Sequence, residues 1–197
     1  MKFFLIPLVV VLIDQISKIF VRGINLQFLN LHIEGLPYGK SHPVIGNFFN
    51  ITFIENPGIA FGIDFGEQFR TLITILTILT TLLLIIYMYM VRNENRMTKI
   101  SVAVISGGAA GNLIDRLFYG VFYGYAPFFE GKVVDFLDIN FFNIHLFNKT
   151  LGSYVFNFAD LAVSIGVFFL ILSLNRKKKE NQPVSAEIEN LLAENRD

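Results

Sequence analysis

The chain has 197 residues, of which 53% are hydrophobic, and its mean hydropathy is +0.55. This apolar content is too high for an ordinary soluble domain and indicates an integral membrane protein. The formal net charge is zero and cysteine is absent, so bulk charge predicts no nucleic-acid partner, and disulfides and thiolate chemistry are excluded.

Four apolar runs are long enough to cross a bilayer as helices, which takes about 17 to 25 residues each. They cover residues 3–21, 71–91, 100–117 and 155–174. We therefore predict a membrane all-α fold of four transmembrane helices. Residues 1–175 are expected to form one membrane domain, and residues 176–197 a polybasic and polar cytoplasmic tail that is either a short helix or disordered.

The first apolar run follows Lys2, as the apolar part of a secretory signal peptide would. No small-x-small cleavage site closes it, and Asp14 and Lys18 interrupt the stretch that would have to be purely apolar. We therefore expect a retained helix.

Basic residues are distributed unevenly between the loops. Lys2, the short loop 92–99 and the cluster 176–179 are rich in Lys and Arg, whereas the longer loops 22–70 and 118–154 are poorer for their length. The positive-inside rule then predicts a multi-pass protein with both termini in the cytoplasm and the two longer loops outside.

Each outer loop has a distinctive composition. Residues 46–56 are rich in aromatic and β-branched side chains, which predicts a small extracytoplasmic β-element on the membrane surface. Asn56, Pro57 and Gly58 then supply turn chemistry. Residues 118–129 are rich in aromatic side chains and predict an aromatic surface loop at the headgroup level.

This topology brings polar residues from distant parts of the sequence to the outer side. The helices contribute Asp14, Lys18, Asn112, Asp115, Arg116, Asn157 and Asp160, and the loops contribute Asn56 and Asp135. Carboxylates inside a membrane are costly and are functional candidates by default. Any single residue is also explained as a helix cap, or as a neutralising pair for Asp14 and Lys18, but the whole set at one depth favours a site.

Spacing adds detail to this set. Asn112 and Asp115, like Asn157 and Asp160, are three residues apart and share one helix face. Gly107 and Gly111 have the small-xxx-small spacing of closely packed membrane helices.

Several reaction types are disfavoured by the residues available. No His lies in a predicted span, and His32, His42 and His145 are expected to be surface residues without ligand spacing. This argues against a serine-histidine pair, and there is no HExxH zinc motif. Paired aspartates remain, in which a neutral acid polarises a carbonyl while its charged partner activates water. Spacing alone does not choose which aspartates form the pair.

Five short motifs occur along the chain from the first predicted helix to the last. They are Asp14-Gln15-Ile16-Ser17-Lys18, Asn56-Pro57-Gly58-Ile59-Ala60-Phe61-Gly62, Gly107-Gly108-Ala109-Ala110-Gly111-Asn112-Leu113-Ile114-Asp115-Arg116, Val133-Val134-Asp135-Phe136 and Phe156-Asn157-Phe158-Ala159-Asp160. In this order they resemble the motifs of bacterial lipoprotein signal peptidase, signal peptidase II.

The resemblance implies an aspartic endopeptidase of the bacterial cytoplasmic (inner) membrane with its active site on the outer side. Its substrates would be diacylglyceryl-modified prolipoproteins, cut just before the lipidated cysteine. It also implies that the chain needs no metal or other cofactor, contacts membrane lipid, is inhibited by globomycin and acts as a monomer. By position, the catalytic aspartates would be Asp135 and Asp160. The residues that bind substrate or support the site would be Asp14, Lys18, Asn56, Gly108, Asn112, Asp115, Arg116 and Asn157.

Two stretches depart from the family pattern. Residues 117–132 form a longer link than is usual, and we expect an aromatic flap beside the site. Residues 138–154 likewise follow the family pattern only loosely, and Asp138 is given no functional role.

Two other classes of protein stay open on the residues alone. A proton-coupled transporter also uses membrane carboxylates, although these gather at one interface and no internal repeat is apparent. A noncatalytic membrane assembly factor would tolerate conservative changes at both aspartates.

Overall fold

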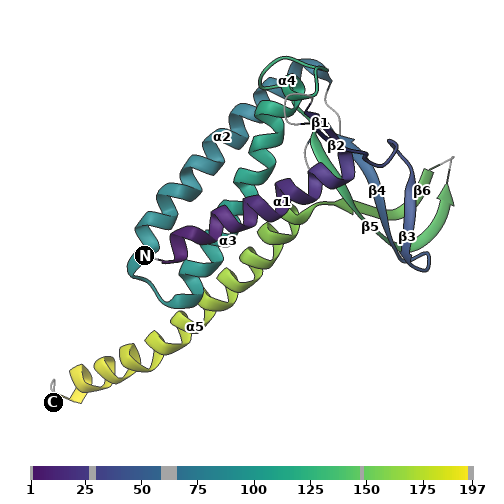
Figure 1. Cartoon of the computed structure of the whole chain (residues 1–197). Coiled ribbons are helices and arrows are strands. Elements are labelled where there is room, and N and C mark those ends of the chain that lie inside the picture. Colours follow the sequence, from purple (N-terminus) through teal and green to yellow (C-terminus); the bar gives the residue numbers. More distant parts are fainter. Residues whose placement is uncertain (1, 27–29, 59–65, 147–148, 195–197) are drawn as a thin grey trace.

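The structure, a computed structural model, describes residues 2–26, 30–58, 66–146 and 149–194. A helical bundle carries β-structure at one end (Figure 1). Its helical segments are η1 (Lys2–Leu5), α1 (Ile6–Arg22), α2 (Glu67–Met90), η4 (Val91–Asn93), α3 (Arg96–Ile114), the π-helical turn η5 (Asp115–Tyr119), α4 (Gly120–Phe122) and α5 (Phe158–Glu194).

Four helices of the described chain are long and apolar enough to cross a membrane, as predicted. They are Lys2–Arg22, Phe69–Asn93, Arg96–Phe122 and Phe158–Arg176. The third is central, since half of its apolar window is buried, against 17 to 22% in the other three. The α1 side chains Leu8, Leu12, Ile16 and Phe20 are at least half exposed, as expected for a face that meets lipid rather than water.

The strands form two antiparallel sheets. In the smaller sheet, β1 (Ile24–Leu26) pairs with β2 (Leu31–Ile33). The larger sheet has the order β3-β4-β5-β6, and its strands are β3 (Ser41–Ile45), β4 (Phe49–Asn56), β5 (Val133–Leu146) and β6 (Lys149–Phe156). The predicted β-element at 46–56 is therefore confirmed as β4, which forms a hairpin with β3.

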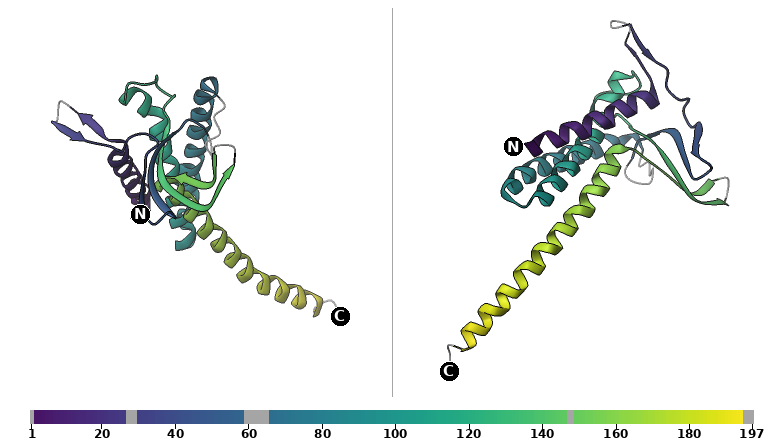
Figure 2. Two further views of the ribbon diagram at one scale, coloured as in Figure 1. Left: turned by 90° about the vertical axis from the view of Figure 1, so that its right-hand side faces the viewer. Right: turned by 60° about the horizontal axis from the view of Figure 1, so that its bottom comes forward.

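The two ends of the bundle differ in what they carry. Both sheets extend from one end, called the sheet end below, and both termini lie toward the opposite end, called the far end (Figure 1). Figure 2 shows α5 running on past the other three helices. This helix continues without a break into the predicted tail, as far as Glu194.

The third membrane helix is longer than predicted. Instead of ending at Leu117, it continues through η5 and α4 to Phe122. Asp115 and Arg116 are buried inside the bundle, so their charge does not end the helix at the membrane surface. The chain turns near Gly124, whose φ of 70° is easily adopted without a side chain.

The remaining loop, residues 123–132, packs against the end of α1. The Arg22 guanidinium lies 3.7 Å from the ring centroid of Tyr123 and forms an ion pair with Glu55 of β4. The ammonium of Lys132 lies 3.4 Å from the other oxygen of the Glu55 carboxylate. Burial raises the pKa of Tyr123 to about 12, although the positive charge of Arg22 opposes this. The predicted aromatic flap is thus a short loop attached to the sheet.

The stretch 138–154, for which no strand was predicted, contains β-structure in the described part of the chain. Residues 138–146 belong to β5 and residues 149–154 to β6, and these strands pair in antiparallel register from Leu137 opposite Phe156 to Leu146 opposite Lys149. Residues 155 and 156, predicted to begin the last helix, belong to β6, and the helix begins at Phe158. Pairing of β5 with β4, which is far away in the sequence, supplies the hydrogen bonds that a local pattern does not predict.

Two apolar clusters pack the described residues. At the sheet end, α1, β4, η5 and β5 meet in a buried cluster of Val21, Phe53, Tyr119, Val134, Phe136 and Leu137. At the far end, α2, η4 and α3 bury Met88, Val91, Val102 and Ala103, with Phe3, Ile6 and Leu170 packed against them. The polar site described next lies on the same side of the bundle as the first cluster.

Candidate active site

A buried ion triad joins α1 to the end of α3. The Lys18 ammonium lies 2.7 Å from Asp14 Oδ2 and 2.8 Å from Asp115 Oδ2, and all three side chains are fully buried. Lys18 and Asp14 face the same way because they are one helical turn apart. Separating such a buried pair by removing one partner costs about 3 to 5 kcal/mol, so the triad fixes how α1 packs on α3.

The third N–H donor of the Lys18 ammonium contacts Asn112. Lys18 Nζ donates to Asn112 Oδ1 at 3.0 Å, and Asn157 Nδ2 donates to the same oxygen at 3.1 Å. The amide nitrogen of Asn112 is thereby directed at Asp160, donating to its Oδ1 at 2.8 Å. A charged network therefore fixes the orientation of this amide.

Asn157 is the link between the two predicted catalytic residues. Its side-chain amide donates to Asp135 Oδ1 at 2.7 Å, and its backbone N–H donates to Asp160 Oδ2 at 3.2 Å. Asp160 N–H in turn donates to Asn157 Oδ1 at 2.9 Å. This reciprocal pair is a capping box for α5, so the cap interpretation is confirmed for these two residues. Their role in a site stays a prediction.

Asp135 comes from the sheet rather than from a helix. The register of β4 and β5 pairs Ile54 with Asp135 and Asn56 with Val133, which brings Asn56 within reach of the carboxylate. Asn56 Nδ2 donates to Asp135 Oδ2 at 3.1 Å. Burial, reinforced by the charge of Asp160, raises the pKa of Asp135 to about 7, against the opposing effect of the Asn56 hydrogen bond.

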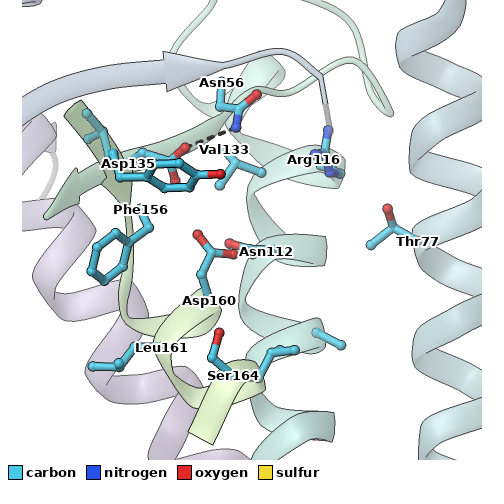
Figure 3. A pocket seen from close by; sticks show the side chains of 14 residues that line it. Asn56, Thr77, Asn112, Arg116, Val133, Asp135, Phe156, Asp160, Leu161 and Ser164 are labelled. Carbon is cyan, nitrogen blue, oxygen red and sulfur yellow. Dashed lines mark hydrogen bonds between the residues drawn. The ribbon is translucent and has the colours of Figure 1, made fainter. Parts of the chain in front are cut away.

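The two carboxylates line one cavity of about 600 Å³ between α2, α3, α5 and the start of β5. Figure 3 shows Asp135 and Asp160 in this cavity, with Asn112 beside them and Arg116 above. The lining residues nearer the middle of the helices are mostly small or apolar, among them Ala109, Leu161 and Val163. The cavity thus has a polar end at the aspartates and an apolar end within the bundle.

Arg116 lines the cavity on the side of the second motif. Its guanidinium donates to the carbonyl of Gly58, while Gly58 N–H donates to Asn56 Oδ1 at 3.0 Å. The Asn56 side chain therefore shapes its own turn and also contacts Asp135. The rest of that motif, residues 59–62, lies outside the described residues.

The predicted residues divide into two layers. Those that line the cavity are Asn56, Asn112, Arg116, Asp135 and Asp160, and Asn157 joins several of them by hydrogen bonds. Within the described chain, Asp14, Lys18, Gly108 and Asp115 are not part of the cavity lining and lie behind it. The sequence placed the nine polar members of this set on one side of the membrane, and the family resemblance added Gly108, but neither distinguished the two layers.

Three glycines of α3 permit this close packing. A Cβ on Gly107 would lie 2.7 Å from Val10 of α1, and one on Gly108 would lie 2.4 Å from the carbonyl of Ala159 in α5. A Cβ on Gly111 would lie 2.6 Å from the Asp14 carboxylate. The predicted close approach at Gly107 and Gly111 is confirmed, and Gly111 makes room for a charged group rather than for another helix backbone.

The described ranges contain no cluster of metal-ligating side chains. No group of three or more His, Cys, Asp or Glu side chains there is placed to hold a metal ion. The acidic groups that line the cavity are the carboxylates of Asp135 and Asp160, and the amides of Asn56 and Asn112 and the guanidinium of Arg116 line it with them.

The chain matches a known protein family. A profile of the family described as signal peptidase (SPase) II matches residues 6–176. The chain belongs to this family.

Individual relatives of this signal peptidase II family member cover most of its length. The lipoprotein signal peptidase of Syntrophus aciditrophicus is 37% identical over 87% of the chain and 90% of its own length. The lipoprotein signal peptidase of Moorella thermoacetica is 34% identical over 88% and 93%, respectively. A bacterial membrane enzyme solved by the in meso method at 1.9 Å resolution aligns with a TM-score of 0.62 and 29% identity, covering 88% of this chain and 92% of that one.

Two site residues were missed by the sequence analysis of this family member. Gln15 Nε2 donates to Asp115 Oδ1 at 2.8 Å and to the Gly111 carbonyl at 3.1 Å. Tyr119, in the link between the third and fourth motifs, donates through its hydroxyl to Gln15 Oε1 at 3.0 Å. The available signal was spacing, since Gln15 follows Asp14 directly and Tyr119 lies one helical turn after Asp115.

Proposed function

We propose that the chain is a membrane aspartic endopeptidase that removes signal peptides from diacylglyceryl-modified prolipoproteins, cutting just before the lipidated cysteine. The observation that carries this proposal is that Asp135 and Asp160 line one cavity and are joined through Asn157. Membership of the signal peptidase II family supports it. The transporter and assembly-factor alternatives have no such support.

The two carboxylates take different roles in the proposed reaction. Asp135, whose pKa is raised to about 7, is the neutral acid. Asp160 is the anion, and it accepts hydrogen bonds from the Asn112 side chain and the Asn157 backbone. A neutral acid beside a charged one is the arrangement that allows two carboxyl groups to perform acid and base chemistry together.

The reaction steps follow from these protonation states. Asp160 takes a proton from a water molecule, whose oxygen attacks the scissile carbonyl carbon, while Asp135 gives its proton to the carbonyl oxygen. The resulting tetrahedral diol collapses as Asp160 returns its proton to the leaving nitrogen and the C–N bond breaks. Asp135 takes back a proton from a diol hydroxyl, which leaves a free carboxylic acid and restores both residues.

Positioning accounts for the remaining residues. Arg116, Asn112 and Asn56 line the cavity and supply donors that would hold the substrate backbone across the aspartates. The lipid of the substrate would stay in the outer leaflet with its acyl chains between helices. Because the anchored lipid holds the reacting bond at one depth, the bond does not have to meet the aspartates by free diffusion.

The proposed placement in the cell follows from charge. Lys and Arg lie mainly in the short loop and at the two ends of the chain, so we propose that both termini are cytoplasmic and that the site opens on the outer side of the bacterial cytoplasmic membrane. Residues 1–175 would form the peptidase domain, and residues 176–197 the cytoplasmic tail.

The test is processing of a synthetic precursor by the purified full-length chain, with the diacylglyceryl group present or absent and with or without globomycin. We expect cleavage of the lipidated form only, inhibition by globomycin, and a product mass that places the cut before the lipidated cysteine. A cut at another bond, or equal cleavage of the unlipidated precursor, would contradict the proposed specificity.

The aspartates are tested in the same assay. Asp135→Asn and Asp160→Asn should each lower kcat by about 10⁴-fold or more while leaving the protein folded and inserted. Asp138→Asn is the matched control, because Asp138 is a buried carboxylate on the same strand that accepts from Thr52 at 2.7 Å, and it should keep normal cleavage. Normal cleavage by either of the first two variants would remove that residue from the dyad.

A further inference from the structure

Two carboxylates that do not line the cavity contact the backbone directly beside the two that do. Asp14 Oδ1 accepts the N–H of Ala159, the residue before Asp160, at 3.0 Å. Asp115 Oδ2 accepts the N–H of Val134, the residue before Asp135, at 3.1 Å. Each proposed catalytic aspartate is therefore preceded by an amide group that a buried carboxylate holds in place.

One lysine connects these two carboxylates. Lys18 Nζ lies 2.7 Å from Asp14 and 2.8 Å from Asp115, with none of the three side chains exposed. The connection runs from the backbone beside Asp160 through Asp14, Lys18 and Asp115 to the backbone beside Asp135. It joins α5 to β5, two elements whose relative position sets the separation of the aspartates.

We propose that Asp14, Lys18 and Asp115 act as a clamp that sets the separation and orientation of Asp135 and Asp160, with Lys18 as the positioning residue at its centre. This inference deepens the proposed function and rests on it. None of the three clamp residues touches the substrate; they act through the backbone that carries the dyad.

The chemistry of an ammonium group fits this role. It has three N–H donors and no acceptor, and here it has three acceptors, in Asp14, Asp115 and Asn112. The third contact orients the Asn112 amide toward Asp160, so all three donors of Lys18 act on the dyad. A planar guanidinium presents its donors in a fixed fork and would not match three converging acceptors.

The clamp is itself held by neighbouring donors. Gln15 Nε2 donates to Asp115 at 2.8 Å and lies 3.2 Å from Asp14 Oδ2, and the Tyr119 hydroxyl donates to Gln15. Buried polar networks of this kind are rigid when their groups are partnered. The separation that the clamp imposes is therefore well defined.

A structural measurement tests the clamp directly. Because the chain contains no cysteine, the double substitution Asp135→Cys/Asp160→Cys introduces the only two thiols, both in the cavity wall. Treatment of the full-length chain with bifunctional methanethiosulfonate reagents of graded spacer length then reports the distance between the two positions. The measurement is made in the parent sequence, with Lys18→Met added, and with Thr98→Val added.

We expect cross-linking of the parent within a narrow range of spacer lengths. Lys18→Met should shift or broaden this range, whereas Thr98→Val should reproduce the parent, because it removes a buried hydrogen bond at the far end of the bundle. An identical spacer range with and without Lys18 would overturn the proposal.

Kinetics on the chain with its aspartates intact gives the second readout. Lys18→Met should lower kcat by about 100-fold, the loss that follows misplacement of reacting groups by about 1 Å, with KM changed less than about threefold. A kcat within about threefold of the parent in folded protein would overturn the clamp. If Lys18→Met does not fold, Lys18→Gln, which keeps two amide donors for the carboxylates, takes its place in both measurements.

The two readouts separate this inference from the proposed function. If the dyad substitutions leave cleavage intact, the proposed function fails, while the spacer range still reports whether Lys18 sets the distance between the two positions. If the dyad substitutions abolish cleavage but Lys18→Met changes neither kcat nor spacer range, the clamp alone fails.

Discussion

The sheet end and the far end of the bundle are built from the same four helices but are held together differently. At the far end, Met88, Val91, Val102 and Ala103 pack against one another, and Thr98 and Ser173 share a hydrogen bond of 2.7 Å. At the sheet end and in its sheet lie the charged side chains that are buried in the described residues, namely Asp14, Lys18, Asp115, Arg116, Asp135 and Asp138.

This difference shows which polar contacts serve helix packing alone. Membrane helices gain little from the hydrophobic effect on associating, and close packing with a few neutral hydrogen bonds is enough to join them. The far end is an example. Buried charge is costly in that setting, so its concentration at the sheet end calls for a functional reason. Substitutions at the two ends test this contrast.

Among the substitutions outside the aspartate dyad and the clamp, the largest effect is expected at Asn157. Its amide joins Asp135 to Asn112, and the residue also caps α5. Asn157→Ala should lower kcat/KM by about 100-fold, and loss of the cap should lower the stability by about 1 kcal/mol. Cleavage of the lipidated precursor and thermal unfolding in detergent measure the two effects. Activity within about threefold of the parent would show that the dyad does not depend on this link.

A pair of glycines at different depths separates packing from catalysis. A Cβ on Gly108 would lie 2.4 Å from the carbonyl of Ala159, beside Asp160, whereas one on Gly166 would lie 2.6 Å from Ile105, further from the site. Gly108→Ala and Gly166→Ala should each destabilise the protein by about 1 to 3 kcal/mol.

Only Gly108→Ala should also slow cleavage, by about tenfold, since it shifts the backbone that carries Asp160. Cleavage rates of the two variants, each divided by its folded fraction, test this difference. Equal losses of activity in the two variants would mean that the site responds to bundle packing as a whole.

The pH dependence of cleavage reports on Asp135. Its pKa of about 7 predicts that kcat/KM falls as pH rises through 7, because the neutral acid loses its proton. Asn56 donates to this carboxylate and lowers its pKa, so Asn56→Ala should move the alkaline limb to higher pH by less than about one unit. If the alkaline limb is the same in Asn56→Ala as in the parent, the group that titrates is not Asp135.

The proton on Asp135 also makes the stability of the fold depend on pH. The pKa of Asp135 is raised above its ordinary value of 3.8, so the folded chain holds this proton more tightly than the unfolded chain. The residue therefore destabilises the fold increasingly as pH rises from about 4 to about 7 and has a constant effect above that range. Thermal unfolding of Asp135→Asn should lack this component.

The smallest effect is expected at the far end. Thr98→Val removes the hydroxyl that meets Ser173 and should lower the stability by about 1 kcal/mol with no change in kcat/KM. A clear loss of activity would show that the far end is coupled to the site, and the contrast between the two ends would fail.

Much of the fold could be predicted because hydropathy is a local property. The four spans were found from apolar runs, and the β-element from the aromatic and β-branched residues of 46–56. The end of the third membrane helix and the pairing of β5 with β6 were not predicted. In the first case Asp115 and Arg116 resemble a helix end by composition but are buried. In the second, the strand is stabilised by pairing with β4.

The sequence predicted which residues belong to the candidate site but not which of them contact one another. The sequence and the family motifs identified ten residues, yet the partners of Lys18 beyond Asp14 could not be read from spacing. Asn112 lies 94 positions away, and Asp115 lies further still. Local spacing places Gln15 beside Asp14 and Tyr119 one turn after Asp115, but the hydrogen bond between Gln15 and Tyr119 spans 104 positions and was missed.

By itself the amino-acid order determined that this protein crosses the membrane four times and gathers its polar side chains at one end, since transfer of each residue into lipid depends on that residue and its neighbours along the chain. Tertiary structure decided which carboxylates face the cavity and which stand behind them. That division depends on helix packing, on the glycines of α3 and on the β4-β5 register, which bring together atoms that no local pattern connects.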